Sequence, residues 1–183
     1  MFNSRNEIIS LLNNCELKSE IDELILTFNN YKEWRDPMYI ELAELDVILK
    51  FELRKQLNRQ AEMRKQNSET VIRRISELAL SIETGNTEYT TEIRIKILSS
   101  MKGIHTAVAS AILTVVYPDR YAIIDRRNWR TLFDQDKVTF TTSDYLRYMD
   151  RIQLLSSKFH MTPQEIDMAI WQLDKERNEY TIG

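Results

Sequence analysis

Asp125 is the residue of this chain best placed to do chemistry, because an apolar stretch precedes it and a helix is predicted to follow. Residues 121–124 read Tyr-Ala-Ile-Ile, which indicates a short extended segment, and residues 126–133 are predicted to be helical. An aspartate at such a junction is a preferred helix N-cap. The backbone N–H groups and the helix dipole there favour its ionised form. An ionised carboxylate can stabilise developing positive charge or deprotonate a nucleophile, although most such aspartates are plain caps.

A glycine turn precedes Asp125 by twenty-two residues. Lys102-Gly103-Ile104-His105 is predicted to be a tight connection between helices at 91–101 and 106–117. Glycine adopts positive φ and lets the backbone approach a phosphate closely. The second helix begins with unpaired N–H groups, and its dipole favours an anion there. Lys102 lies beside the turn and can add a charge contact.

These features together resemble the core of the helix–hairpin–helix DNA glycosylases. In that family a Leu-x-Gly-(Val/Ile)-Gly hairpin leads into a helix of small residues, then an apolar stretch, then an aspartate that opens the next helix. The corresponding residues here run from Leu98 through the hairpin to Leu113, and from Pro118 to Asp125. The likeness is strong over residues 95–133 and fainter over 67–80 and 167–171. It implies an all-α, two-lobed helical bundle that binds double-stranded DNA.

The resemblance also implies an activity. In that family the target nucleotide is flipped out of the duplex into a pocket, because its glycosidic bond cannot be reached inside the stack. Asp125 matches the catalytic carboxylate. The lysine nucleophile of the oxoguanine glycosylase branch corresponds to Ala107, which cannot form a Schiff base. A monofunctional DNA N-glycosylase without lyase activity is therefore implied, in base excision repair or in defence against modified phage DNA.

Further DNA contacts are expected around this core. Arg126 and Arg127 directly follow Asp125, and the hairpin supplies Lys102, Gly103, His105 and Thr106. His105 stands where the family usually has the second glycine of the hairpin. It is expected either to contact a phosphate as an imidazolium or to be a tolerated turn residue.

Two tryptophans are candidates for the base pocket. Trp129 lies one turn beyond Asp125, although a position in the core is the stronger alternative. Trp34 lies at a break between predicted helices, whereas Trp171 is assigned to the core. No metal site is predicted, because neither histidine has ligand spacing and Cys15 is the only cysteine. The four cysteines of a four-iron, four-sulfur cluster are also missing. No cofactor is implied, but binding of a monovalent cation by the hairpin stays open.

Composition favours long helices in one domain. The chain has 183 residues, of which only three are glycine and three proline, so tight turns are scarce. Eight or nine helices and no strand are predicted, in a single domain over 1–183. Residues 1–66 are its poorly matched N-terminal helical part, and residues 67–183 hold the hairpin core and the closing helices. Within the first part, a helix is predicted to begin at Pro37 and to run from Met38 to about Arg64.

Charge is unevenly distributed. The net charge is −3, yet residues 50–74 carry eight Lys or Arg against three Glu, and residues 91–130 carry seven against three acids. Such a distribution suits a face that meets phosphates, although a solvated helix surface is the ordinary alternative. No signal peptide or membrane span is predicted, and a cytoplasmic location is expected.

Two other functions stay open from the sequence. A non-catalytic DNA-binding module would retain the fold without the chemistry, and the absent lysine and altered hairpin glycine favour it. A helical interaction protein without nucleic acid has only the acidic total charge in its favour.

Overall fold

A computed structural model describes residues 1–179, and over that range the protein is all-helical with no strand. The predicted all-α class is thereby confirmed. In chain order the elements are α1 (Arg5–Asn14), α2 (Lys18–Lys32), α3 (Leu42–Leu53), the 3-10 turn η1 (Arg54–Gln56), α4 (Ala61–Arg64), α5 (Glu69–Ser81), α6 (Thr87–Leu98), α7 (Thr106–Val116), α8 (Arg126–Phe133), α9 (Thr142–Phe159) and α10 (Pro163–Glu179).

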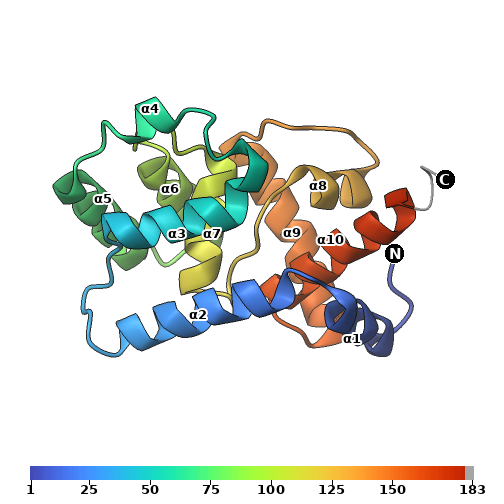
Figure 1. Cartoon of the computed structure of the whole chain (residues 1–183). Helices are drawn as coiled ribbons and strands as arrows, with labels where there is room; N and C mark the ends of the chain where they lie inside the picture. Colours follow the sequence, from blue (N-terminus) through green and yellow to red (C-terminus); the bar gives the residue numbers. More distant parts are fainter. Residues whose placement is uncertain (180–183) are drawn as a thin grey trace.

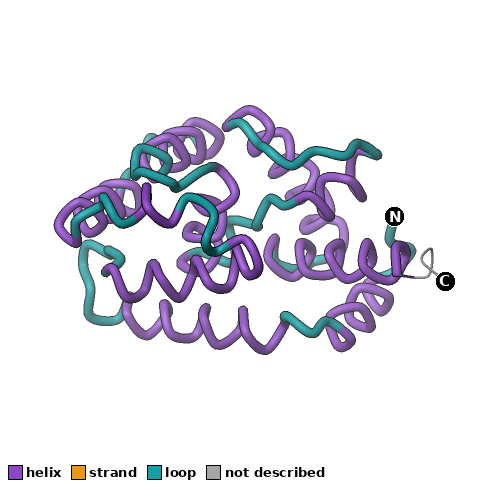
Figure 2. Tube along the Cα trace, turned by 45° about the horizontal axis from the view of Figure 1, so that its top comes forward, coloured by secondary structure: helices purple, strands orange, loops and turns teal. Residues whose placement is uncertain are grey.

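The helices pack in two groups. Helices α2, α3, α5, α6 and α7 form one group, and α1, α8, α9 and α10 form the other (Figure 1). Helix α6 packs against α9 and so joins the two groups. Loops connect the helices throughout, and α1 lies beside α10 (Figure 2). The segment between α7 and α8 passes from the first group to the second (Figure 1), and Asp125 is its last residue, directly before α8.

Helix α7 is the buried centre of the fold. Ten of its eleven residues are buried, and a helix that is apolar all round is typical of an interior position. Its small residues allow α2 and α3 to pack closely against it. The Oγ of Ser110 accepts the Ile124 N–H at 3.1 Å, so α7 also fixes the extended segment that leads to Asp125.

The predicted helix from Pro37 to about Arg64 is wrong in two places. Helix α3 begins only at Leu42, because residues 38–41 are non-helical and the Ile40 N–H donates to the Ser76 Oγ at 2.9 Å. The helix then ends at Leu53, where Arg54 has a φ of 42°. A 3-10 turn and the short α4 follow, and Gln60 before α4 has a φ of 60°.

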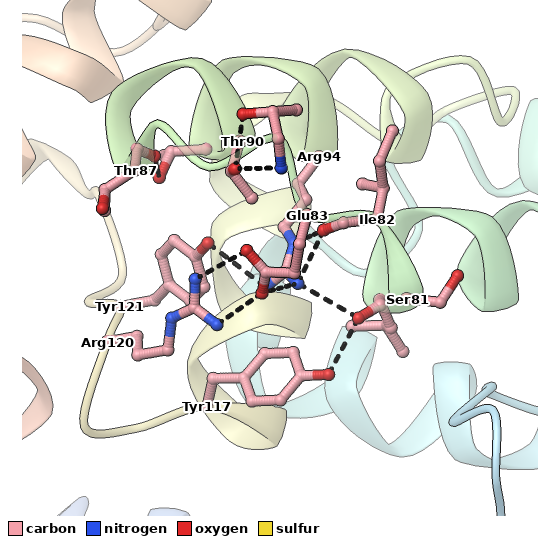
Figure 3. A network of polar contacts seen from close by, with 12 residues as sticks. Ser81, Ile82, Glu83, Thr87, Thr90, Arg94, Tyr117, Arg120 and Tyr121 are labelled. Atoms are coloured by element: carbon pink, nitrogen blue, oxygen red, sulfur yellow. Dashed lines mark hydrogen bonds and ion pairs between the residues drawn. The ribbon is translucent and has the colours of Figure 1, made fainter.

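A buried arginine holds the end of the first helix group that lies away from the hairpin. Arg94 is 1% exposed and donates to the carbonyl oxygens of Leu80 (3.1 Å) and Ile82 (3.0 Å) at the end of α5. A cation in this position satisfies free carbonyls and is favoured by the helix dipole. Glu83 accepts from the same guanidinium at 2.9 Å. The close-up in Figure 3 also labels Ser81, Thr87, Thr90, Tyr117, Arg120 and Tyr121 around this group.

Candidate functional site

Asp125 is the N-cap of α8, as predicted. Its Oδ1 accepts the backbone N–H of Asn128 at 2.7 Å, and its side chain is only partly exposed. The four residues before it are buried. The carboxylate is therefore held at the start of α8 by local hydrogen bonding and by the packed segment behind it.

The expected glycine turn joins α6 and α7. Helix α6 runs from Thr87 to Leu98, rather than over the predicted 91–101, and α7 begins at Thr106. Gly103 has a φ of 71°, a left-handed conformation that favours glycine. His105 is the N-cap of α7 in an extended conformation and makes no side-chain cap hydrogen bond. His105 therefore occupies its place in the turn without backbone strain.

The turn and the aspartate open onto the same pocket. A hollow of about 340 Å³ is lined by Gly103, His105, Thr106 and Ala107 on one side and by Asp125 and Arg126 on another. Lys102 is not among its lining residues. Two distant parts of the sequence are thus brought together, and the N-terminus of α7 faces the hollow that contains the Asp125 side chain.

A second, larger pocket of about 910 Å³ is also lined by Asp125, together with residues from both helix groups. Its walls combine aromatic side chains, Phe51 and Trp171, with polar groups that include Arg127 and Asn128. Four residues line both pockets: Glu52, Leu53, Gln56 and Asp125. The two hollows therefore share a wall, and Asp125 belongs to it.

Glu52 is the site residue that the sequence did not single out. It lies near the end of α3, in the stretch with the poorest family likeness, and counts there only as one acid within a basic segment. Its carboxyl makes no hydrogen bond or ion pair with any residue in the described part of the chain. The signal that could have found it is its spacing from Ile48, which is fully buried four residues earlier on the same helix face.

Burial controls the acidity of these carboxyl groups. It raises the pKa of Asp125 to about 6, although the N–H groups of Asn128 and Arg127 oppose the shift. Burial also raises the pKa of Glu52 well above its usual range, and the negative charges of Asp125 and Asp167 add to the effect. At neutral pH Asp125 is therefore mainly ionised, while the raised pKa of Glu52 means that its carboxyl gives up its proton less readily than an ordinary glutamate does.

Asp167 anchors the floor of the larger pocket. It is 2% exposed and accepts the Ile123 N–H at 3.1 Å, the Tyr148 hydroxyl at 2.5 Å and the side-chain amide of Asn128. Burial raises the pKa of Asp167 despite these donors. The network fixes Asn128 so that its Oδ1 is buried without a hydrogen-bond partner among the described residues.

The two arginines after Asp125 are already paired within the protein. Arg126 forms two contacts with Asp136, at 2.5 and 2.6 Å. Arg127 lies with its guanidinium carbon 4.9 Å from the Trp171 ring centroid and a nitrogen 3.8 Å from Asp174. Both line a pocket, yet each would have to leave or share a partner in order to bind a phosphate.

Residues 60–67 cover the hairpin. A Cβ added to Gly103 would lie 2.6 Å from the Cγ of Arg64, and the His105 Nε2 lies 2.8 Å from the Gln60 Oε1. The side-chain amide of Asn67 pairs with the backbone of Lys102 through two hydrogen bonds, of 2.9 and 2.8 Å. Part of the basic segment at residues 50–74 is thus packed on the turn.

The tryptophans proposed for the base pocket line neither hollow. Trp34 is 64% exposed and stacks on the Arg35 guanidinium, 4.7 Å from its ring centroid. Trp129 is 1% exposed and packs in the core against Phe133. Its helix turns the ring inward, which is the alternative weighed above. Trp171, assigned to the core from its spacing, instead lines the larger pocket and is only partly buried.

No protein-family model, curated protein or solved structure matches this chain. Within residues 1–179 no three His, Cys, Asp or Glu side chains are grouped so that they could hold a metal ion. None of the helices described is long and apolar enough to cross a bilayer. Among the described residues, the two adjoining pockets and their carboxyl groups are the features that bear on function.

Proposed function

We propose that this protein is a monofunctional DNA N-glycosylase that removes a modified or damaged base from double-stranded DNA in the cytoplasm. One observation carries the proposal: the turn at Gly103 and the Asp125 carboxyl line the same pocket. A nucleotide phosphate at the N-terminus of α7 would place the adjoining sugar next to Asp125. The larger pocket beyond the shared wall has room and aromatic surface for an extruded base.

The chemistry assigned to Asp125 follows from its charge near neutral pH. Its carboxylate would stabilise the oxocarbenium-like sugar and direct a water molecule to the anomeric carbon. Ala107 lines the pocket where a lysine nucleophile would be needed, so no Schiff base forms and no lyase step is expected. The reaction needs no cofactor. Repair of damaged DNA and defence against modified phage DNA are both compatible with it.

A non-catalytic DNA-binding module is the second candidate. The observation that favours it is the covering of the hairpin, because the Arg64 side chain lies where a phosphate would approach Gly103. A cap role for Asp125 without catalysis is consistent with that alternative.

The test is base release from duplexes that each carry one modified or damaged base. The wild-type protein is expected to release at least one of them, and Asp125→Asn to slow that release by about 100-fold or more. Asp134→Asn is the matched control, because Asp134 is an exposed aspartate at the other end of α8. Binding of duplex DNA should persist in both variants.

Each result separates the candidates. Unchanged release by Asp125→Asn would reduce Asp125 to a helix cap and contradict the mechanism. Tight, salt-dependent duplex binding without release of any base would favour the non-catalytic module.

A further inference from the structure

Glu52 occupies the wall between the two pockets together with Asp125. It comes from α3 in the first helix group, whereas Asp125 precedes α8 in the second. Both side chains line both hollows, so a nucleotide whose sugar lies beside Asp125 would bring its base within reach of Glu52. The Glu52 carboxyl has no hydrogen bond or ion pair within the described part of the chain, which leaves it available to a ligand.

A second observation concerns a polar residue in the wall of the larger pocket. Asn128 is 2% exposed and lines the larger pocket. Its amide nitrogen is committed to Asp167, to the Ile123 carbonyl and to Tyr148, while its Oδ1 has no partner in the described residues. Buried acceptors in native proteins are nearly always paired, so an N–H or O–H donor is needed at this point. A base edge can supply one.

The carboxyl groups of Asp125 and Glu52 differ in what determines their pKa. Asp125 accepts a backbone N–H and has a pKa of about 6, whereas Glu52 lacks such a donor and has its pKa raised by burial and by the Asp125 charge. Neighbouring carboxyls whose surroundings separate their pKa values divide the roles of acid and base between them. Asp125 is then the member suited to act as the ionised carboxylate, and Glu52, with the raised pKa, the member suited to donate a proton.

We infer that Glu52 is a second catalytic residue, the general acid that protonates the departing base. This inference rests on the proposed glycosylase function. The glycosidic C–N bond breaks, and its electron pair leaves with the base, while a ring nitrogen of the base takes the proton from the Glu52 carboxyl. The water oxygen bonds to the sugar carbon, and its proton passes to Asp125. Exchange with solvent then restores both groups.

The inference defines a class of substrate. An uncharged base is a poor leaving group until a ring nitrogen is protonated, whereas a cationic N-alkylated base leaves without that proton. A site with its own proton donor is therefore suited to uncharged bases that carry a ring-nitrogen acceptor. The unpaired Asn128 Oδ1 adds a preference for an N–H on the same base.

Single-turnover rates of Glu52→Gln test the role, on each uncharged base that the wild-type protein releases. Glutamine has nearly the same size but no transferable proton, so release should slow by about 100-fold or more. The wild-type rate should also fall as the pH rises through the Glu52 pKa, and Glu52→Gln should lose that alkaline limb. Glu23→Gln is the matched control, because Glu23 is an exposed glutamate of α2 that lines neither pocket.

The possible results are distinct. Unchanged rates in Glu52→Gln, or a slower variant that keeps the alkaline limb, would overturn the acid role while leaving the proposed function in place. No release by the wild-type protein would instead contradict the proposed function itself. A carboxyl ¹³C NMR titration of the wild-type protein gives a readout without catalysis. Glu52 should titrate well above its usual range, and titration at its ordinary pKa would overturn the inference.

Discussion

Asp125 combines two properties that normally exclude each other, since it is both a helix cap and a partly buried acid. As a cap it accepts the Asn128 N–H, and as a buried group it has a pKa raised to about 6. Burial of a charge costs free energy unless a partner compensates for it. An ordinary cap at an exposed helix end would not incur that cost.

The raised pKa predicts how Asp125→Asn changes stability with pH. The folded state binds the Asp125 proton more tightly than the unfolded state, so this residue's contribution is fully present below about pH 4 and is lost as the pH rises to about 6. Asparagine keeps the cap and removes the charge. We expect Asp125→Asn to raise the free energy of unfolding by about 1–2 kcal/mol at pH 7, after allowance for partial exposure, and by little at pH 4.

Urea unfolding at the two pH values measures this difference. Asp134→Asn again serves as the control, with little change expected at either pH. A variant that is less stable than the wild-type protein at pH 7 would mean that the charged cap is net stabilising and that burial is not the dominant effect.

At the scale of single residues, the sequence predicted the features that depend on neighbouring residues in the chain. Asp125 follows an apolar run and precedes a helix, and both are local signals. The role of Glu52 depends on the end of α3 and the start of α8 lining the same pockets, although Glu52 and Asp125 are more than seventy positions apart in the chain. No spacing rule encodes it. The inward position of Trp129 was similarly ambiguous, because one helical turn beyond Asp125 is compatible with either the pocket or the core.

At the scale of elements, helices with capping residues and regular apolar spacing were predicted well. Helix α5 begins after Ser68, whose Oγ accepts the Val71 N–H, and α10 begins at Pro163 after a capping box at Thr162. The break after α3 was missed because it uses positive φ at Arg54 and Gln60 instead of glycine or proline. Tertiary packing on the hairpin determines that break, and propensity does not reveal it.

Packing on the hairpin predicts a difference between the two glycines with positive φ. Gly85 has a φ of 78° and open space where an alanine methyl group would lie, whereas the same group at Gly103 would meet Arg64 and the Gln60 carbonyl. Gly85→Ala should therefore cost about 1 kcal/mol of stability from backbone strain alone. Gly103→Ala should cost about 1–3 kcal/mol more, because of steric overlap.

A double-mutant cycle measured by urea unfolding separates the two causes. Arg64→Ala should recover part of the loss in Gly103→Ala and none of the loss in Gly85→Ala. Equal costs for the two glycine substitutions, or no coupling to Arg64, would mean that residues 60–67 do not pack on the turn.

For the whole molecule, internal ion pairing changes the meaning of the local charge balance. Six of the seven basic residues between 91 and 130 have a carboxylate partner within 4 Å, and these are Arg94, Lys96, Arg120, Arg126, Arg127 and Arg130. Lys102 instead donates to the Gln66 Oε1 at 2.7 Å. A count of residues along the sequence cannot tell a paired cation from one available to a phosphate.

Because most cations of residues 91–130 are paired, we predict a shallow dependence of DNA binding on salt. The slope of log K against log salt concentration for duplex DNA should be about −2 to −4, which corresponds to a small number of phosphate contacts. Lys102→Gln should reduce its magnitude by about 1. Arg120→Gln should leave it unchanged, because Arg120 follows the opposite end of α7 and is paired with Glu83 at 2.8 Å.

Fluorescence anisotropy with a labelled duplex over a range of salt concentrations gives these slopes. Equal changes in the two variants would show that the hairpin end of α7 has no special part in binding. A slope near zero in the wild-type protein would contradict DNA as the partner.

Helix α7 has a consequence for how the protein can diverge. Only its first three residues line a pocket, while the others pack against α2, α3 and α6 or support the segment before Asp125. Natural selection for function should therefore constrain the buried residues of α7, although most of them contact no ligand. An extra methylene group on one of them would shift the segment that positions Asp125. Residues of the larger pocket that have no part in the chemistry, such as Phe51 and Trp171, are freer to vary, so specificity can change while the backbone that positions Asp125 stays fixed.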